Sequence, residues 1–378
     1  MSNADVLTQF DEWLKDGSPV AALVMRQWLE PVEGKDAVIF PPTYPIEQDK
    51  PGYNIDRFDK DGLSVCQIDS VGSQANRMEP IFKSGPYSKL VPQIIISAGD
   101  RKIHLLDAGH RAADAIVRFS ELGPELHEAF RIYRDEGNIE PLARIAPTSV
   151  VFGSWDSRAT QVKLPRMVRS VIRAFNVKEL HRSAQYSTIA GEILEGGDAE
   201  VTTKGPKAEL GLAHVPAVLT HGGIQVLGEI RRDAILNLVA LRALAGSDVN
   251  NTSKLRRYLF SLALTSLTAQ PETFLREGCE LVLDPDHAGQ WHLVKHDGAR
   301  EPCEISHDQA LKFASAAAIA FGVNEQVRTA LFDSTLANAV LGLSKEDRKK
   351  LLRQGPVTKG AIEALKKTPK NKKKEGAG

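Results

Sequence analysis

A strand pattern followed at once by a helix pattern, between residues 63 and 82, most constrains the fold. Residues 63–69 form a short, mostly apolar run that is typical of a β-strand. Directly after it, apolar side chains recur at helical spacing, at Val71, Ala75, Met78 and Phe82. Pro80 disfavours helical geometry at the residue before it, so the helix should bend or end there. This unit favours a fold that mixes strands and helices.

The rest of the chain divides into a mixed part and a more helical part. Strands are expected at 91–97, 102–106, 149–155 and 213–219, and a helix at 110–119. Residues 168–175 fit either a strand or a helix. After Gly222 and Gly223, helices are expected at 226–244, 253–268, 307–321, 325–340 and 345–351, interrupted by a hairpin at 280–295. The expected class is α+β with a largely helical C-terminal region.

Five segments follow from these patterns and from the distribution of proline and lysine. Residues 1–30 should be helical, 31–62 a Pro-rich projecting insertion, 63–222 the mixed core, 223–365 mainly helical and 366–378 a disordered Lys-rich tail. Three prolines between residues 41 and 45 forbid a helix and suit an extended loop.

The cysteines and the lack of long apolar runs limit the cellular setting and the cofactors. Cys66, Cys279 and Cys303 are far apart and form no C-x-x-C pair, so neither a zinc site nor a disulfide framework is expected. The first residues lack a secretory signal pattern, and no apolar run approaches the roughly 20 residues that span a bilayer. We expect a protein of the reducing cytoplasm, with no membrane segment, no metal and no cofactor.

Charge is balanced over the whole chain but uneven along it. The chain has 378 residues, with 48 basic and 48 acidic side chains. From residue 366 onward there are six lysines and a single acid, so the body before the tail is mildly acidic. Bulk charge therefore cannot attract a polyanion to the body, and any nucleic-acid site must come from local clusters.

The strongest cluster of positive charge lies between residues 158 and 182. Its seven basic residues stand against the single acid Glu179: Arg158, Lys163, Arg166, Arg169, Arg173, Lys178 and Arg182. On a helix Arg166, Arg169 and Arg173 share a face, and on a strand Arg169 and Arg173 share a side. Either arrangement lines up guanidinium groups for successive phosphates. The alternative is an ordinary solvated face, although such faces usually mix both signs.

Two other segments combine polar side chains with an expected helix start. The first holds Ser70, Ser73, Gln74, Asn76 and Arg77 at a strand-to-helix junction, which presents backbone N–H groups to an anion. The alternative is a simple N-cap by Asp69 or Ser70. The second begins with His110 and Arg111 and includes Arg118. There a capped helix with a salt-bridged Arg111 is favoured over a metal site formed by Asp107, His110 and Asp114.

Sequence motifs of common enzymes are missing. The chain has no G-x-S-x-G, Walker A, H-E-x-x-H or G-x-G-x-x-G pattern. We therefore expect no catalytic residues.

Several segments together resemble a single family. They are Pro41–Tyr44, Ile68–Glu79 (Ile-Asp-Ser-Val-Gly-Ser-Gln-Ala-Asn-Arg-Met-Glu), His110–Arg118, Pro147–Ser157 and Arg166–Phe175. This set closely resembles the backbone subunit of the type I-G (formerly I-U) CRISPR Cascade complex, a member of the RAMP superfamily. The resemblance covers roughly residues 28 to 245, and the block at 68–79 is long and unusual.

The resemblance implies a fold and a set of partners. The fold would be a ferredoxin-like or RRM-like palm with an inserted thumb, for which residues 31–62, including Pro41, Pro42, Thr43 and Tyr44, are the candidate. Copies of the chain would polymerise head to tail along a CRISPR RNA and support recognition of target DNA. A fused end-binding and processing subunit and a large Cascade subunit would complete the complex.

A backbone subunit has to accept any guide sequence, so it should contact phosphates and 2′-hydroxyls and leave base edges free. The usual aromatic RNA-stacking signature of RRM proteins is missing, which favours backbone contacts. The expected RNA-binding residues are Ser70, Ser73, Gln74, Asn76, Arg77, His110, Arg111, Arg118, Lys163, Arg166, Arg169 and Arg173.

Two other functions remain open on the sequence. Related backbone subunits of type III effectors cut target RNA with a loop aspartate, so a metal-dependent ribonuclease using Asp69 or Asp107 is the main alternative. A scaffold protein that binds no nucleic acid is the other.

Overall fold

A computed structural model describes residues 3–47, 50–58, 62–189, 193 and 201–367. Its largest element is a nine-stranded sheet whose strand pairs are all antiparallel. The main path through the sheet runs β15 (Phe274–Arg276), β16 (Cys279–Leu283), β1 (Val20–Pro31), β14 (Ile230–Asn237), β11 (Val168–Phe175), β6 (Leu63–Asp69) and β5 (Ile55–Phe58). The remaining strands, β17 (Gln290–Lys295) and β18 (Arg300–Pro302), extend it beside β1. The expected α+β class is confirmed.

The register of β11 and β14 assigns one face of the sheet to the core. Val168 pairs with Leu236, Ser170 with Ala234 and Ile172 with Arg232, and all six residues are buried. Helix α3 (Val71–Met78) packs on this face, where Ser170 Oγ donates a hydrogen bond of 2.8 Å to Gln74 Oε1. Because side chains alternate along a strand, Arg169, Val171 and Arg173 point to the opposite face. Arg169 is exposed and Arg173 half-buried, so this second face is at least partly open to solvent.

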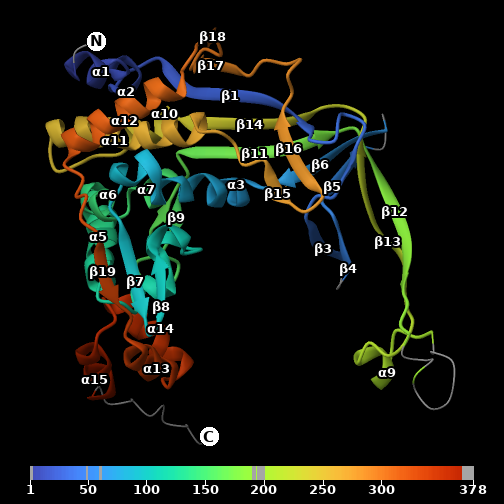
Figure 1. The fold of residues 1–378 in the computed structure, drawn as a ribbon. Helices are drawn as coiled ribbons and strands as arrows, with labels where there is room; N and C mark the ends of the chain where they lie inside the picture. The colour runs from blue at the N-terminus through green and yellow to red at the C-terminus, as the bar shows by residue number, and fades with distance from the viewer. Residues whose placement is uncertain (1–2, 48–49, 59–61, 190–192, 194–200, 368–378) are drawn as a thin grey trace, which may run out of the picture.

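Helices far apart in sequence complete the main core beside the sheet (Figure 1). They are α1 (Asn3–Thr8), α2 (Asp11–Leu14), α7 (Pro147–Val151), α10 (Leu238–Arg242), α11 (Val249–Thr268) and α12 (His307–Phe321). Phe10 packs edge-on against Phe260 and Phe313, and the rings of Tyr258 and Phe321 stack at 4.6 Å. Edge-to-face and offset aromatic pairs of this kind add about 0.5–1.5 kcal/mol beyond their buried area.

Two projections extend from the same side of the sheet (Figure 1). One, here called the arm, is the long ribbon of β12 (Val177–Tyr186) and β13 (Val215–Val226), with α9 (Pro206–Glu209) at its end; β2 (Val38–Ile39) pairs at its base. The other, here called the leg, contains β7 (Ile94–Ala98), β8 (Arg101–His104) and β19 (Arg328–Leu331) with α4 (Ala115–Arg118), α5 (Gly123–Glu136) and α6 (Glu140–Ile145).

Three C-terminal helices with a small core of their own end the leg (Figure 1). They are α13 (Ser334–Leu341), α14 (Lys345–Gln354) and α15 (Lys359–Lys367). The buried residues of this core are Leu336, Val340, Leu351, Val357 and Ile362. Lys366 and Lys367, expected to be disordered, end α15, and the rest of the expected tail lies outside the described residues.

Several local predictions are confirmed. Strand β6 and helix α12 have the predicted bounds, β7 and β8 form the predicted pair around Gly99, and α11 and α14 occur where helices were expected. Helix α3 ends at Met78 and is followed by a 3-10 turn, η1 (Glu79–Lys83), as Pro80 predicted. The prolines after residue 40 do exclude a helix, but the segment forms a hairpin of β3 (Thr43–Glu47) and β4 (Lys50–Tyr53) rather than a loop.

Other predictions are wrong, mainly where a strand was taken for a helix. The first part of the expected N-terminal helical region does contain α1 and α2, but its last part, residues 20–30, is the long strand β1. The expected helix at 226–244 is divided between β14 and the short helix α10. In β14 the charged Arg232 occupies a buried position, which hides the alternation of Ile230, Ala234 and Leu236. The segment boundary expected near residue 222 would place β11 and β14 in different segments, although the two strands are neighbours in the sheet.

Four further segments differ from expectation. Residues 149–155 were expected to be a strand, but residues 149–151 end helix α7, which has a proline at its first position, and only Ser154 and Trp155 are in a strand. The expected helix at 110–119 is split by Asp114, which caps α4. Residues 325–340 contain β19 before α13. Finally, β16 and β17 form no hairpin; they pair in tandem with the two halves of β1. In each case tertiary contacts outweigh a weak local preference. Among the described helices, none is long and apolar enough to cross a membrane.

Candidate nucleic-acid interface

The polar residues at the start of α3 bind to one another and to the sheet. Asp69 is 2% exposed and accepts hydrogen bonds from Gln74 Nε2 at 2.6 Å and Arg77 Nε at 3.2 Å. Ser70 caps the helix, since its Oγ accepts from the Ser73 amide at 3.2 Å. Gln74 also accepts from Ser170, so its amide is used on both sides. This part of the motif stabilises the junction of β6, α3 and β11.

A buried arginine extends this network into the sheet. Arg232 is 2% exposed, donates to Ser170 Oγ at 3.1 Å and to Gln27 Oε1 at 3.1 Å, and makes no ion pair among the described residues. Burial lowers the pKa of Arg232 to about 10, with Asp69 opposing the change. The guanidinium still carries its charge at neutral pH.

Arg77 and Asn76 also have partners within the protein. Arg77 Nη2 donates to the Leu275 carbonyl at 2.6 Å and so ties α3 to β15. Asn76 is exposed, but its Oδ1 accepts from Arg111 Nη2 at 3.2 Å. Both residues were expected to bind RNA, and both hold elements of this chain together.

Arg111 is a buried structural residue, as the salt-bridged alternative proposed. It is 7% exposed, pairs with Glu79 at 2.6 Å, and its guanidinium carbon lies 5.7 Å from the centre of the Phe152 ring. Burial raises the pKa of Glu79, and the charge of Arg111 opposes that rise. Arg111 has a φ of 53°, an unusual value for a side chain other than glycine, which the surrounding contacts must stabilise.

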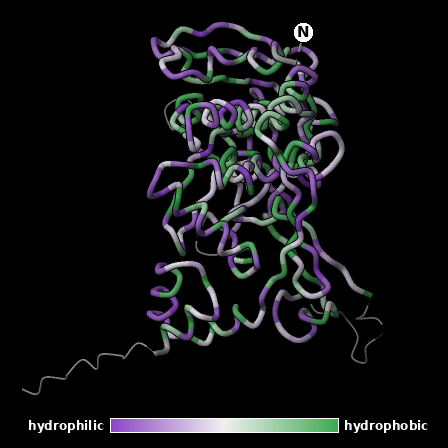
Figure 2. Tube along the Cα trace, turned by 90° about the vertical axis from the view of Figure 1, so that its left-hand side faces the viewer, coloured by the Kyte–Doolittle hydropathy of each residue, from purple (hydrophilic) through white to green (hydrophobic). Residues whose placement is uncertain are grey.

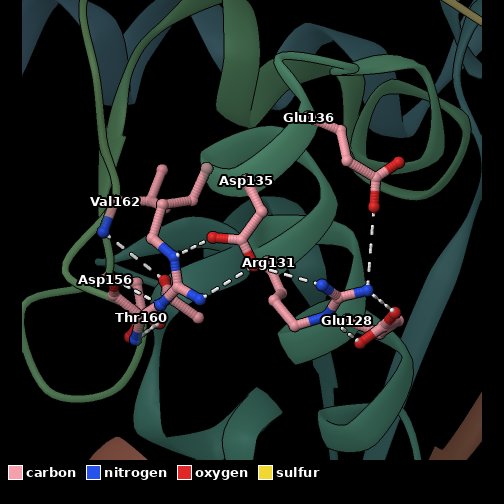
Figure 3. A network of polar contacts seen from close by, with 8 residues as sticks. Glu128, Arg131, Asp135, Glu136, Asp156, Thr160 and Val162 are labelled. Carbon is pink, nitrogen blue, oxygen red and sulfur yellow. Dashed lines mark hydrogen bonds and ion pairs between the residues drawn. The ribbon is translucent and has the colours of Figure 1, made fainter.

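Arg118, which is half-buried, and the buried Asp156 form a second ion pair in the leg. Arg118 Nη2 donates to Asp156 Oδ1 at 3.0 Å. Asp156 also accepts from the amides of Ala159 and Thr160 and from Thr160 Oγ1. Figure 3 shows this cluster near the exposed network of Glu128, Arg131, Asp135 and Glu136 on α5. Arg118 is therefore engaged inside the protein.

The basic residues between 158 and 182 are different, because none of the seven makes an ion pair among the described residues. The acid of this stretch, Glu179, pairs with Arg57 of β5 instead. Residues 168–175, whose type the sequence left open, form strand β11, so Arg169 and Arg173 share the face opposite α3. The prediction that these two arginines point to the same side is confirmed. Neither arginine forms an ion pair within the described part of the chain, although the register places Asp233 opposite Val171 on the same face.

Arg166 lies beside the start of α3. Its Nη2 is 4.0 Å from the position that a Cβ on Gly72 would take, and its Cγ is 2.8 Å from the corresponding position on Gly153. Burial, together with the nearby charge of Arg111, lowers the pKa of Arg166. An uncompensated cation therefore lies at the N-terminal end of α3, close to Ser70, where an anion would find both charge and helix dipole.

A small exposed surface next to Arg166 adds an aromatic ring that the sequence analysis missed. Trp155 is 59% exposed, and Lys163 Nζ lies 5.8 Å from the centre of its ring. Trp155 pairs with Lys163 where β9 (Ser154–Trp155) meets β10 (Lys163–Leu164), and Ser154 Oγ donates to the His110 carbonyl, which brings the exposed His110 beside this pair. We call His110, Trp155, Lys163 and Arg166 the elbow surface. The spacing of Trp155 and Lys163 across a polar turn was the signal that could have predicted it.

The residues proposed as a thumb lie at the base of the β3–β4 hairpin. Pro41 is buried and its carbonyl accepts from Arg276 Nη1, while Pro42, Thr43 and Tyr44 are half-buried. The Gly223 amide of the arm donates to the Tyr53 hydroxyl at 3.0 Å, linking this hairpin to β13. The longer projection is the arm, which the sequence analysis did not predict (Figure 1).

The aspartates of the ribonuclease alternative have protein partners. Asp69 is buried and bound as described above, and Asp107 is exposed and pairs with Lys83 Nζ at 2.6 Å. Among the described residues, no three His, Cys, Asp or Glu side chains gather in a group that could hold a metal ion. The three cysteines are free thiols.

The fold and this surface define a mixed α and β protein with uncompensated cations on an open sheet face and its edge. Over residues 23–179 the chain matches the model of a protein family described as CRISPR-associated protein GSU0053. That stretch contains most of β1 and all of β6, α3, the elbow surface and β11, and it is similar to CRISPR-associated proteins. The comparison with curated proteins finds no match.

Proposed function

We propose that this chain is a CRISPR RNA-binding backbone subunit of a type I-G Cascade complex, built on a RAMP palm, and that it is not an enzyme. Copies of the chain line up head to tail along the guide RNA, and the assembly supports recognition of target DNA. The match to a CRISPR-associated family over residues 23–179 supports a role in a CRISPR system.

The observation that carries the proposal is the set of basic residues between 158 and 182 that lack an acidic partner in the described chain. Fold-stabilising arginines nearby, such as Arg111 and Arg118, do have carboxylate partners. The free-energy cost of desolvating a phosphate is offset by the charge-assisted hydrogen bonds that an unpaired guanidinium donates to it. An arginine that already pairs with a carboxylate has fewer free N–H groups to donate. Arg166, Arg169, Arg173 and Lys163 therefore form the proposed RNA contact.

The chemistry of these groups suits a guide of any sequence. Guanidinium, ammonium and backbone amide groups bind phosphates and leave the base edges free for pairing. Trp155 adds a flat ring that can stack on a base without selecting it. The exposed His110 and the half-buried Ser73 complete the set, while the remaining candidates act by positioning these elements: Ser70, Gln74, Asn76, Arg77, Arg111 and Arg118.

The arm supports the head-to-tail part of the proposal. It exposes large apolar side chains that a monomer leaves in water: Tyr186, Ile189, Leu210, Val218 and Leu219, each 60% exposed or more. Such a concentration marks a surface that is covered in an assembly. We assign the thumb role of the family to this arm, in place of residues 41–44.

The test compares charge reversal on the open sheet face with charge reversal elsewhere. The chain is purified after co-expression with a guide RNA, as wild type, as Arg169→Glu/Arg173→Glu, and as the control Arg300→Glu/Lys312→Glu. Both control residues are exposed and lie outside the 158–182 segment. We expect co-purified RNA, read from the absorbance ratio at 260 and 280 nm and the mass of the assembly, to be lost only from the Arg169/Arg173 variant. Equal RNA retention in all three proteins would contradict the assignment of Arg169 and Arg173 to the RNA contact.

A cleavage assay tests the non-enzymatic part separately. Guide-loaded wild type, Asp69→Ala and Asp107→Ala are incubated with complementary RNA and Mg²⁺. We expect the target RNA to stay intact with all three proteins. Metal-dependent cutting by the wild type that disappears in either variant would establish the ribonuclease instead.

A further inference from the structure

The three-helix unit at the end of the leg carries a second concentration of positive charge. Residues 345–367 contain eight basic and three acidic side chains. The helices α13–α15 pack around their own core, and Phe119 of the leg contacts it. Figure 1 shows the unit at the end of the leg, well away from β11, so this charge belongs to a different surface from the proposed RNA contact.

Helix α14 arranges part of this charge in a row. Lys345, Lys349 and Arg353 follow one another at intervals of four residues, which places them along one side of the helix, roughly 6 Å apart. All three are exposed, and none makes an ion pair among the described residues. Like charges at this spacing destabilise a helix, so the row works against the stability of α14.

Three other side chains of α14 are used inside the unit, while Glu346, Lys350 and Gln354 are exposed. Leu351 is buried, Leu352 packs against the same core, and Arg348 Nη1 donates to the Leu341 carbonyl at the end of α13. The exposed side of α14 therefore carries no apolar residue. That argues against insertion into a lipid surface, which requires an apolar face beside the basic one. Figure 2 shows the hydrophilic, purple stretches at this lower end of the molecule.

We propose that Lys345, Lys349 and Arg353 form a docking surface for double-stranded DNA, bound through its phosphate backbone and without sequence preference. A row of cations along one side of a helix fits a regular line of phosphates better than a folded acidic protein. Lys350, which is also exposed on α14, adds to the positive electrostatic potential of this surface. This surface is separate from the RNA contact and does not depend on the function proposed above.

The test uses the full chain, loaded with guide RNA where it binds one, and a labelled random 25-base-pair DNA duplex followed by fluorescence anisotropy. The variant Lys345→Ala/Lys349→Ala/Arg353→Ala keeps α14 in good helix formers. We expect at least a tenfold loss of duplex affinity at low salt. The slope of log affinity against log salt should become shallower by about 2 to 3, because three phosphate contacts are removed.

A matched control separates this surface from bulk charge. Lys89→Ala/Arg300→Ala/Lys312→Ala removes three exposed cations elsewhere and should leave duplex affinity within twofold. Equal losses in both triple variants, or no loss in either, would overturn the proposal. The proposal would also be overturned if polyglutamate competed as strongly as unlabelled duplex, or if the α14 variant lost binding to anionic vesicles but kept binding to duplex.

Retention of guide RNA by the α14 variant is measured in parallel. Loss of RNA with duplex binding intact would reassign the surface to the guide. The duplex assay works equally on RNA-free chain, so failure of the RNA proposal is recognised separately.

Discussion

Two groups of arginines differ in whether a carboxylate lies beside their guanidinium groups. Arg77, Arg111 and Arg118 contact carboxylates at 2.6 to 3.2 Å. Arg166, Arg169 and Arg173 have no carboxylate partner in the described chain. Both groups come from polar, arginine-bearing motifs and resemble each other in sequence. Pairing and burial separate the arginines that stabilise the fold from those available to a ligand.

The largest expected effect tests the buried group. Replacing Arg111 with methionine leaves Glu79 as a buried carboxylate without its cation, and breaking such a pair costs about 3 to 5 kcal/mol. We expect urea unfolding of RNA-free protein to show a loss of this size. Arg169→Met is the matched control, and because Arg169 is exposed and unpaired it should change the unfolding free energy by about 0.5 kcal/mol or less. Similar losses in both variants would remove the distinction between the two groups.

A second prediction concerns the pair in the leg. Asp156→Ala removes the partner of Arg118 and three further hydrogen bonds in the turn before β10. We expect a loss of about 2 to 3 kcal/mol in unfolding free energy, since buried donors are left unsatisfied. Arg131→Ala, in the exposed network beside it in Figure 3, should cost clearly less, because solvent screens its ion pairs. A larger loss for Arg131 than for Asp156 would contradict this account.

The sequence predicted the mixed class and the strand–helix unit at 63–78, because that unit has a clean hydrophobic period and a proline stop. It failed for β1, whose apolar residues suggested a helical stripe. It also failed for β14, where the charged Arg232 occupies a buried position in the sheet and hides the alternation. Such positions depend on partners distant in the chain, like Gln27 and Ser170, and a local pattern does not contain them.

The same limit explains the candidate site. Local charge density singled out residues 158–182, and Arg169 and Arg173 do share one face. The motif at 70–77 seemed equally suited to a phosphate, yet its side chains bind Asp69, Ser170 and the carbonyl of Leu275. Whether a polar side chain is free is a tertiary property, so the sequence could propose both segments but not choose between them.

The smallest expected effect concerns Arg166, which lies between the two groups of arginines. It is close to the buried Arg111 but has no acidic partner of its own. Arg166→Ala should leave the unfolding free energy nearly unchanged, because no ion pair is broken and a repulsion is relieved. Guide RNA affinity should fall about fivefold, and the salt slope should become shallower by about 1, the expectation for a single phosphate contact. Filter binding of single-stranded RNA to RNA-free protein at several salt concentrations measures both quantities. Arg300→Ala serves as the control for loss of a single exposed charge. If Arg166→Ala instead unfolds the protein and leaves the salt slope unchanged, Arg166 belongs with the arginines that hold the fold, and the RNA contact shrinks to the sheet face.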